Sequence, residues 1–265
     1  MPGEQSSFFC AGNLGRVYFM YVLALDTTTR DGSVALVDDD HTIEVRRGDP
    51  ARSQAERLPG ELLDVASAHH VDIGAVDLFA VAAGPGSFTG LRIGIATMQG
   101  LALTSGRRIV AVSALDALAQ TVAEDATPGT YVAAWMDARR HDVFAALYQV
   151  TDATVFSPAR VIEVDHATAA RPEATLDRWG ARIGTASVVF VGDGAVQYAA
   201  SIDSRAIPTW SVLAGVPLLA GTIGRMAVAA ARQGATIDPA AIQPLYVRRP
   251  DVEMERERRA LTDAS

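Results

Sequence analysis

A glycine-rich stretch has the residue types and spacing that could bind a ligand. It reads Gly-Pro-Gly-Ser-Phe-Thr-Gly over residues 84–90, after an apolar run at 78–83 and before a helical pattern. Glycines allow close approach of the backbone, and the first N–H groups of a helix lack an intrahelical partner. Such a turn can cradle a phosphate group. No P-loop lysine follows it, so we predict that it is mainly a structural turn that positions the next helix.

Two aspartates end apolar strand patterns and could also take part in phosphate binding. Asp26 and Asp137 could each hold a cation beside a phosphate, or could accept hydrogen bonds from the turn that follows. We favour the turn role for both. Together with the loop, the first aspartate defines a candidate degenerate phosphate site. Its residues are Asp26, Thr27, Gly84, Gly86, Ser87 and Thr89.

The side chains needed for metal or nucleophilic catalysis are poorly placed in the sequence. No two histidines are four residues apart, as a helical metal site of the H-x-x-x-H kind requires. The single cysteine, Cys10, excludes an internal disulfide and a thiolate zinc site, and no serine has an evident histidine base. We therefore predict no catalytic residue, no metal and no cofactor. The histidines are His41, His69, His70, His141 and His166.

The elements that must position these residues form two similar halves. The first half shows three antiparallel strands, a helix, the strand at 78–83, the glycine turn and a helix at 89–104. After a turn at 127–129 the order restarts, with a third strand expected at 154–164 and a helix at 167–179. This order predicts two α/β lobes that arose by duplication. The predicted domains are a weakly ordered extension (1–19), a first lobe (20–125), a second lobe that includes a final helix (126–249) and a charged tail (250–265).

Composition narrows the possible functions. The chain has 265 residues, 49% of them hydrophobic, and 31 acidic against 23 basic residues give a net charge of −8. Such a chain repels phosphate overall, so it is not expected to be the main nucleic-acid-binding subunit of a complex. No apolar run approaches the roughly 20 residues of a membrane span, and residues 1–19 lack the layout of a signal peptide. We expect a cytoplasmic protein without membrane contact.

The helices on either side of the strand at 78–83 form a candidate contact surface. Gly90 and Gly94 lie one turn apart and give the second helix a shallow face that invites close packing. If this face is exposed, it is an apolar patch that needs a partner. The alternative, that both helices cover their own sheet, explains the apolar stripe but less readily the small residues. The predicted interface residues are Leu58, Leu62, Val65, Gly90, Leu91, Gly94, Ile95 and Met98.

Several of these segments resemble the TsaB (YeaZ) family of tRNA threonylcarbamoyladenosine biosynthesis proteins. The matching segments are 23–28, 84–94 with 99–102, 136–139 with 143–144, 192–194 and 244–248. The resemblance implies two RNase H-like lobes of the actin, sugar kinase and heat-shock ATPase (ASKHA) type, with a degenerate second lobe. One departure is Ser53, which stands where the family commonly has a histidine before its first helix.

The resemblance also implies a function. Members are non-catalytic partners of the transferase TsaD, which carries the metal and places a threonylcarbamoyl group on N6 of adenosine 37 in tRNAs that read ANN codons. The implied partners are a TsaD homologue, bound through the helices of the first lobe, and the ATPase TsaE in a larger complex. A homodimer is plausible when TsaD is absent, and tRNA is contacted only indirectly. Two alternatives stay open: an active ASKHA-type small-molecule kinase and a metal-dependent glycoprotease-like hydrolase.

Overall fold

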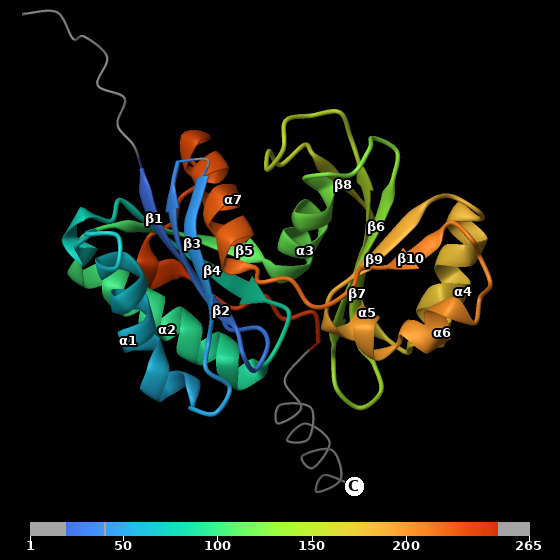
Figure 1. Ribbon diagram of the computed structural model, residues 1–265, viewed down its shortest axis with the longest axis horizontal. Helices are drawn as coiled ribbons and strands as arrows, with labels where there is room; N and C mark the ends of the chain where they lie inside the picture. Colours follow the sequence, from blue (N-terminus) through green and yellow to red (C-terminus); the bar gives the residue numbers. More distant parts are fainter. Residues whose placement is uncertain (1–19, 40, 249–265) are drawn as a thin grey trace, which may run out of the picture.

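The computed structural model describes residues 20–39 and 41–248, which form two lobes, each built on a five-stranded sheet (Figure 1). The predicted extension at 1–19 and the tail at 250–265 lie outside the described residues. The predicted two-lobe α/β fold is confirmed. Each lobe consists of a mixed sheet with helices on its faces, so that the apolar side of every element is covered by another element.

The first sheet has the strand order β3-β2-β1-β4-β5. Its first three strands form the predicted antiparallel meander, and β4 and β5 continue the sheet in parallel with β1. Because β1 and β4 run parallel and in register, their carboxyl ends meet at one edge of the sheet. The strands are β1 (Tyr21–Asp26), β2 (Ser33–Asp38), β3 (His41–Arg47), β4 (Leu78–Gly84) and β5 (Arg108–Ser113).

Successive side chains along the strands of the first sheet point to opposite faces, and different helices cover the two faces. Leu23 and Leu25 of β1 pack with the apolar sides of α1 and α2, whereas Val22 and Ala24 face α7. The 3₁₀ helices η1 and η2 complete this lobe. The bounds are α1 (Gln54–Ser67), η1 (Ile73–Ala75), α2 (Phe88–Thr104), α3 (Ala114–Ala123), α7 (Ala220–Arg232) and η2 (Pro239–Ala241).

The second sheet repeats the connectivity of the first. Its order β10-β9-β6-β7-β8 again places the first strand of the lobe in the middle, beside an antiparallel hairpin and a parallel neighbour. The last two strands are much shorter than their counterparts in the first lobe. The elements are β6 (Tyr131–Asp137), β7 (Val143–Val150), β8 (Val161–Ala170), α4 (Pro172–Ile183), β9 (Val188–Val191), α5 (Asp193–Gln197), α6 (Ala199–Asp203) and β10 (Trp210–Val212).

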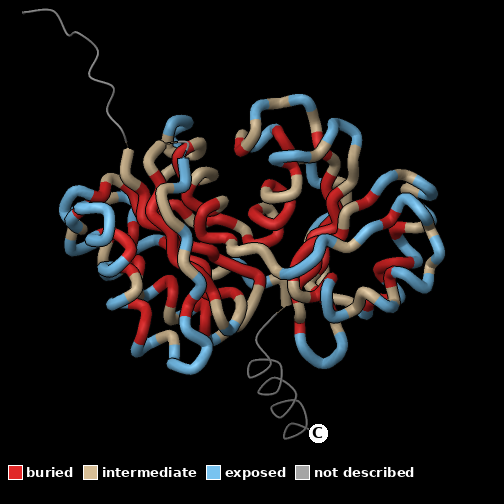
Figure 2. The backbone as a smooth tube through the Cα atoms, viewed as in Figure 1, coloured by how far each residue is buried: buried red, intermediate tan, exposed pale blue. Residues whose placement is uncertain are grey.

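A continuous apolar core joins the two lobes. Buried segments are concentrated in both sheets and in α3 and α7, which lie between them (Figure 2). Side chains of the first sheet, both helices and the second sheet belong to one cluster, and separate clusters fill the outer side of each lobe. The lobes are therefore fixed to each other on the side of α3 and α7.

Three predictions about the elements need correction. The final helix belongs to the first lobe, because the buried side of α7 packs on β1 and β2, and Gly224 lies against Val37. The third strand of the second lobe is β8, which begins at Val161, and α4 starts correspondingly later than predicted. The sequence reading missed β5 and α3, in which most residues are apolar and the polar ones are too few to give a clear strand or helix period.

Within the part of the chain that the structure describes, no helix has the length and apolar character needed to span a membrane.

Candidate functional site

A cleft of about 960 Å³ opens between the lobes at the carboxyl ends of the central strands. In α/β folds this end of the sheet is where ligands bind, because the connecting loops converge there. The first lobe contributes the turns at 28–30, 50–54 and 85–91. The second lobe contributes residues 137–139, Phe144 and Asp193, and the chain returns at 245–248 to line the same cleft.

The glycine-rich loop is held by contacts within its own lobe. β4 ends at Gly84, and a cis peptide bond joins this residue to Pro85. A Cβ at Gly86 would lie 2.6 Å from the Cβ of Thr28, and the backbone N–H of Ser87 donates to the Thr28 carbonyl at 2.8 Å. The Ser87 hydroxyl then accepts from the N–H of Gly90 and caps α2. The loop thus seats α2 against the β1–β2 turn.

The small residues of α2 serve the same packing. A Cβ at Gly90 would lie 2.3 Å from the Thr27 carbonyl oxygen, and one at Gly94 would lie 2.2 Å from Thr27 Oγ1. Thr27 is fully buried, so α2 can approach β1 this closely only where it has no side chain. The shallow face that we interpreted as a contact surface is filled by the protein itself.

The predicted interface residues are consequently in the wrong place for a partner. Each of the eight is buried, and their apolar side chains are at most 6% exposed. Five of them pack in the apolar core on this side of the sheet, the two glycines lie against Thr27, and Leu91 lies beside Gly84. The outward sides of these helices instead carry Leu63 and Leu103, which are 51% and 54% exposed. The residues corrected are Leu58, Leu62, Val65, Gly90, Leu91, Gly94, Ile95 and Met98.

The residues of the candidate phosphate site are brought together, but only part of the set faces the cleft. Gly86, Ser87 and Thr89 line it, whereas Asp26, Thr27 and Gly84 lie behind the loop. The Asp26 carboxylate accepts hydrogen bonds from the Thr28 backbone N–H at 2.8 Å and from its hydroxyl at 2.6 Å. These are the bonds of an aspartate that caps a turn.

Burial controls the protonation of the acids at this end of the sheets. It raises the pKa of Asp26, the bonds from Thr28 oppose that rise, and the charge of Asp193 adds to it. Burial also raises the pKa of Asp193, which accepts from the backbone N–H groups of Asp137 and Gly194. Asp137 in turn accepts from the N–H of Arg139. The acids of both lobes thus accept hydrogen bonds from backbone N–H groups at this end of the sheets.

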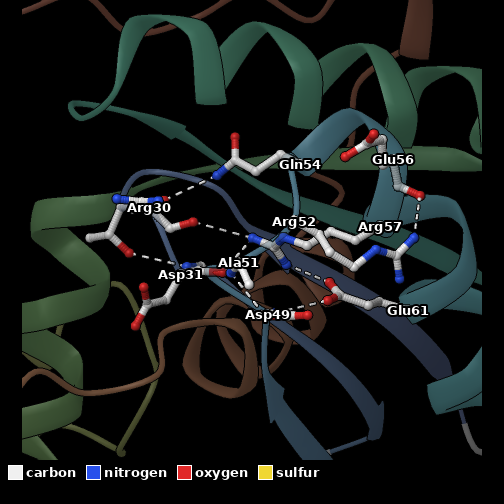
Figure 3. A network of polar contacts seen from close by, with 11 residues as sticks. Arg30, Asp31, Asp49, Ala51, Arg52, Gln54, Glu56, Arg57 and Glu61 are labelled. Carbon is white, nitrogen blue, oxygen red and sulfur yellow. Dashed lines mark hydrogen bonds and ion pairs between the residues drawn. The ribbon is translucent and has the colours of Figure 1, made fainter.

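A buried arginine, which the sequence reading did not identify, fixes the turn after β1 that lines the cleft on the first lobe (Figure 3). Arg57 of α1 is 1% exposed, donates to the carbonyl oxygens of Arg30 and Asp31, and pairs with Glu61 at 2.5 Å. Gln54, one turn earlier, donates to the Thr29 carbonyl at 3.1 Å. The i, i+4 spacing of the pair was the only signal in the sequence, and it did not predict burial.

The start of α1 is set by Ser53, the residue at which the sequence differs from the family that it resembles. The backbone N–H and the hydroxyl of Ser53 both donate to the Glu56 carboxylate, at 3.1 and 2.7 Å. This is the capping-box arrangement, which satisfies a free N–H group at the helix end. Ser53 lines the cleft beside the Arg57 network.

Metal-binding side chains are dispersed in the structure. His69 contacts Glu44 and His166 contacts Glu163, each at 2.7 Å on the surface. Over residues 20–39 and 41–248, no three side chains of His, Cys, Asp or Glu lie together in a way that could hold a metal ion. The chemistry that the described cleft offers is therefore that of backbone groups, carboxylates and the arginines on its rim.

Comparisons with known proteins find both similar sequences and a similar fold. The family model described as TsaD, tRNA N6-adenosine threonylcarbamoyltransferase, matches residues 49–249. The tRNA threonylcarbamoyladenosine biosynthesis protein TsaB of Escherichia coli K12 is 37% identical over 130 residues, or 49% of this chain and 55% of that protein. TsaB of Haemophilus influenzae is 34% identical over 126 residues, which are 46% of this chain and 51% of that protein. The chain thus spans about half the length of the curated relatives it matches.

A solved structure covers more of the chain. YeaZ from Pseudomonas aeruginosa superposes with a TM-score of 0.70 at 29% identity, and the match covers 86% of this chain and 99% of that one. Both lobes therefore have counterparts in that structure.

Proposed function

This chain belongs to the family described as TsaD, tRNA N6-adenosine threonylcarbamoyltransferase, with the TsaB and YeaZ proteins as its relatives, and we propose that it is a non-catalytic subunit in tRNA threonylcarbamoyladenosine formation. In this role it binds a TsaD homologue and supports transfer of the threonylcarbamoyl group to N6 of adenosine 37. An ATPase of the TsaE kind joins the larger complex, and the TsaD homologue binds the tRNA. The tRNA substrate makes the cytoplasm the expected location.

The observation that carries the non-catalytic part is the way the glycine-rich loop is used. Its backbone donor at Ser87 is bonded to Thr28, and the glycine slots of α2 are filled by Thr27. A loop that served phosphate chemistry would keep such donors and slots free for the ligand. The contacts support a structural role, in which the loop fixes the position of α2.

The outward faces of α1 and α2 support the partner-binding part. Leu63 and Leu103 expose more than half of their side chains on these two neighbouring helices. Gly60 and Gly100 lie on the same outward sides, and a Cβ at either would meet no atom within 4 Å. Exposed leucines beside small residues allow the helix of a partner to approach closely and bury apolar surface. We therefore move the proposed TsaD contact from the buried stripes to these outward faces.

The test of the contact is the affinity of the purified full-length chain for the TsaD homologue of its own organism, measured by calorimetry. We expect Leu63→Arg and Leu103→Arg each to weaken binding at least about tenfold, because each places a charge at the centre of an apolar contact. Ile162→Arg is the matched control, since Ile162 is 56% exposed on the second lobe. Affinities that stay unchanged in both leucine variants would exclude this surface.

Reconstitution tests the function itself. TsaD and TsaE are mixed with tRNA, ATP and threonylcarbamoyl-adenylate, with or without this chain, and the modified nucleoside is measured. We expect modification to depend on the chain. The proposal fails if modification is equally fast without it, and the non-catalytic part fails if the chain alone supports transfer.

A further inference from the structure

The C-terminal part of the described chain passes directly over the glycine-rich loop. After η2, Ile242 is buried in the outer core of the first lobe, and the chain then runs past the end of β4 toward the second lobe (Figure 1). The backbone N–H of Leu245 donates to the Ala83 carbonyl at 2.7 Å. A Cβ at Gly84 would lie 2.5 Å from the Leu245 carbonyl oxygen, and Gly84 has φ +125°. The glycine therefore gives room to the chain's own backbone.

An aromatic contact fixes the next residue to the first turn of α2. The ring of Tyr246 stacks on Phe88 with centroids 5.6 Å apart, and Arg92 Nε donates to the Tyr246 hydroxyl at 3.3 Å. The Arg92 guanidinium lies 4.0 Å from the centre of the Phe88 ring. Stacked rings with a cation above them attract one another beyond their area of contact. This is the attachment to the first lobe.

Arg248 makes the corresponding attachment to the second lobe. Its guanidinium donates to the Ala138 carbonyl at 3.3 Å and forms an ion pair with Asp142, in the hairpin between β6 and β7. The two side chains of the pair are 21% and 23% exposed, so water screens them less than a surface pair. Arg171 also approaches the Asp142 carboxylate, at 3.5 Å.

We propose that residues 245–248, which we name the C-terminal strap, close the interlobe cleft and can be released as a unit. The strap bonds to one lobe at each end and crosses the cleft on the side opposite the core of α3 and α7. Its hold is limited, because Leu245 and Tyr246 remain 47% and 41% exposed. Release of the strap uncovers the backbone of Gly84 and removes the link between the β6–β7 hairpin and α2.

Hydrogen exchange of the full-length chain, followed by mass spectrometry, tests the strap without any ligand or partner. Arg248→Ala removes only the attachment to the second lobe. If the strap couples the lobes, amide exchange should quicken about tenfold, or 1.4 kcal/mol, in the first-lobe segment 83–92 as well as in the hairpin at 138–144. Arg182→Ala is the matched control, because Arg182 forms an exposed ion pair at 3.7 Å on α4. It should leave both segments unchanged.

A variant at the first-lobe end of the strap distinguishes coupling between the lobes from a purely local effect on the contacted lobe. Tyr246 contacts the first lobe, so Tyr246→Ala should quicken exchange in the distant hairpin at 138–144, whereas Tyr246→Phe keeps the stacked ring and should stay close to the unaltered chain. The proposal is overturned if each variant affects only the lobe that its side chain touches, or if neither variant changes exchange. Either variant alone can give this answer if the other does not fold. Failure of the partner-binding test would leave this result untouched.

Discussion

Alanine at Gly94 and alanine at Gly100 are the same change in one helix, with opposite surroundings. A Cβ at Gly94 would lie 2.2 Å from Thr27 Oγ1 and 3.0 Å from Thr27 Cγ2, whereas a Cβ at Gly100 meets nothing within 4 Å. Both positions lie inside α2, so both variants gain the helix propensity of alanine, about 1 kcal/mol. The difference between the two variants therefore isolates the packing against β1.

The magnitude follows from how little Thr27 can move. It is fully buried, and its hydroxyl has no hydrogen-bond partner among the described residues. Overpacking of a filled core costs about 1–3 kcal/mol. We expect Gly100→Ala to raise the free energy of unfolding by about 1 kcal/mol. Gly94→Ala should lie about 1–3 kcal/mol below it.

Urea denaturation followed by circular dichroism measures both variants. The double variant Thr27→Ala with Gly94→Ala completes a cycle, because Thr27→Ala removes the two atoms closest to the new methyl group. The next closest atom, Thr27 Cβ, lies 3.1 Å from that group. We expect the cost of Gly94→Ala to fall by at least about 1 kcal/mol in that background. If Gly94→Ala stabilises the chain as much as Gly100→Ala, α2 does not depend on this close approach and the reasoning fails.

Two further predictions concern buried charge. Arg57→Met should lower the free energy of unfolding by about 3 kcal/mol, because it removes the cation that pairs with Glu61 and the donor to two backbone carbonyls. Arg52→Ala on the exposed rim should change it by less than about 0.5 kcal/mol. Equal urea midpoints for these two variants would contradict this. Asp26→Asn keeps an oxygen to accept from Thr28 but loses the charge. Because burial raises the pKa of Asp26, the folded state binds its proton more tightly, and its contribution to stability is lost as pH rises from about 4 toward the raised pKa. The Asn variant should therefore gain stability relative to the unaltered chain across this range, and parallel stability curves would contradict the expectation.

Local pattern was enough to predict most of the elements. Alternation and turn residues defined the meander of β1, β2 and β3, and the glycine turn with the apolar stripe after it defined β4 and α2. The repeated order of elements then predicted two lobes, because the same folding pattern occurs once in each lobe. Where most residues are apolar and polar positions are few, as in β5 and α3, the sequence reading missed the elements.

The sequence by itself determined most of the elements, the duplicated order and the family, since all three depend on residue types and short spacings. Only the tertiary structure decided which surfaces are free. An apolar stripe with glycines has the same spacing whether it faces a partner or its own sheet, and Thr27, 67 positions before Gly94, fills the slot. The return of α7 to the first sheet and of residues 245–248 to the cleft depends in the same way on contacts between distant parts of the chain, which no local pattern encodes.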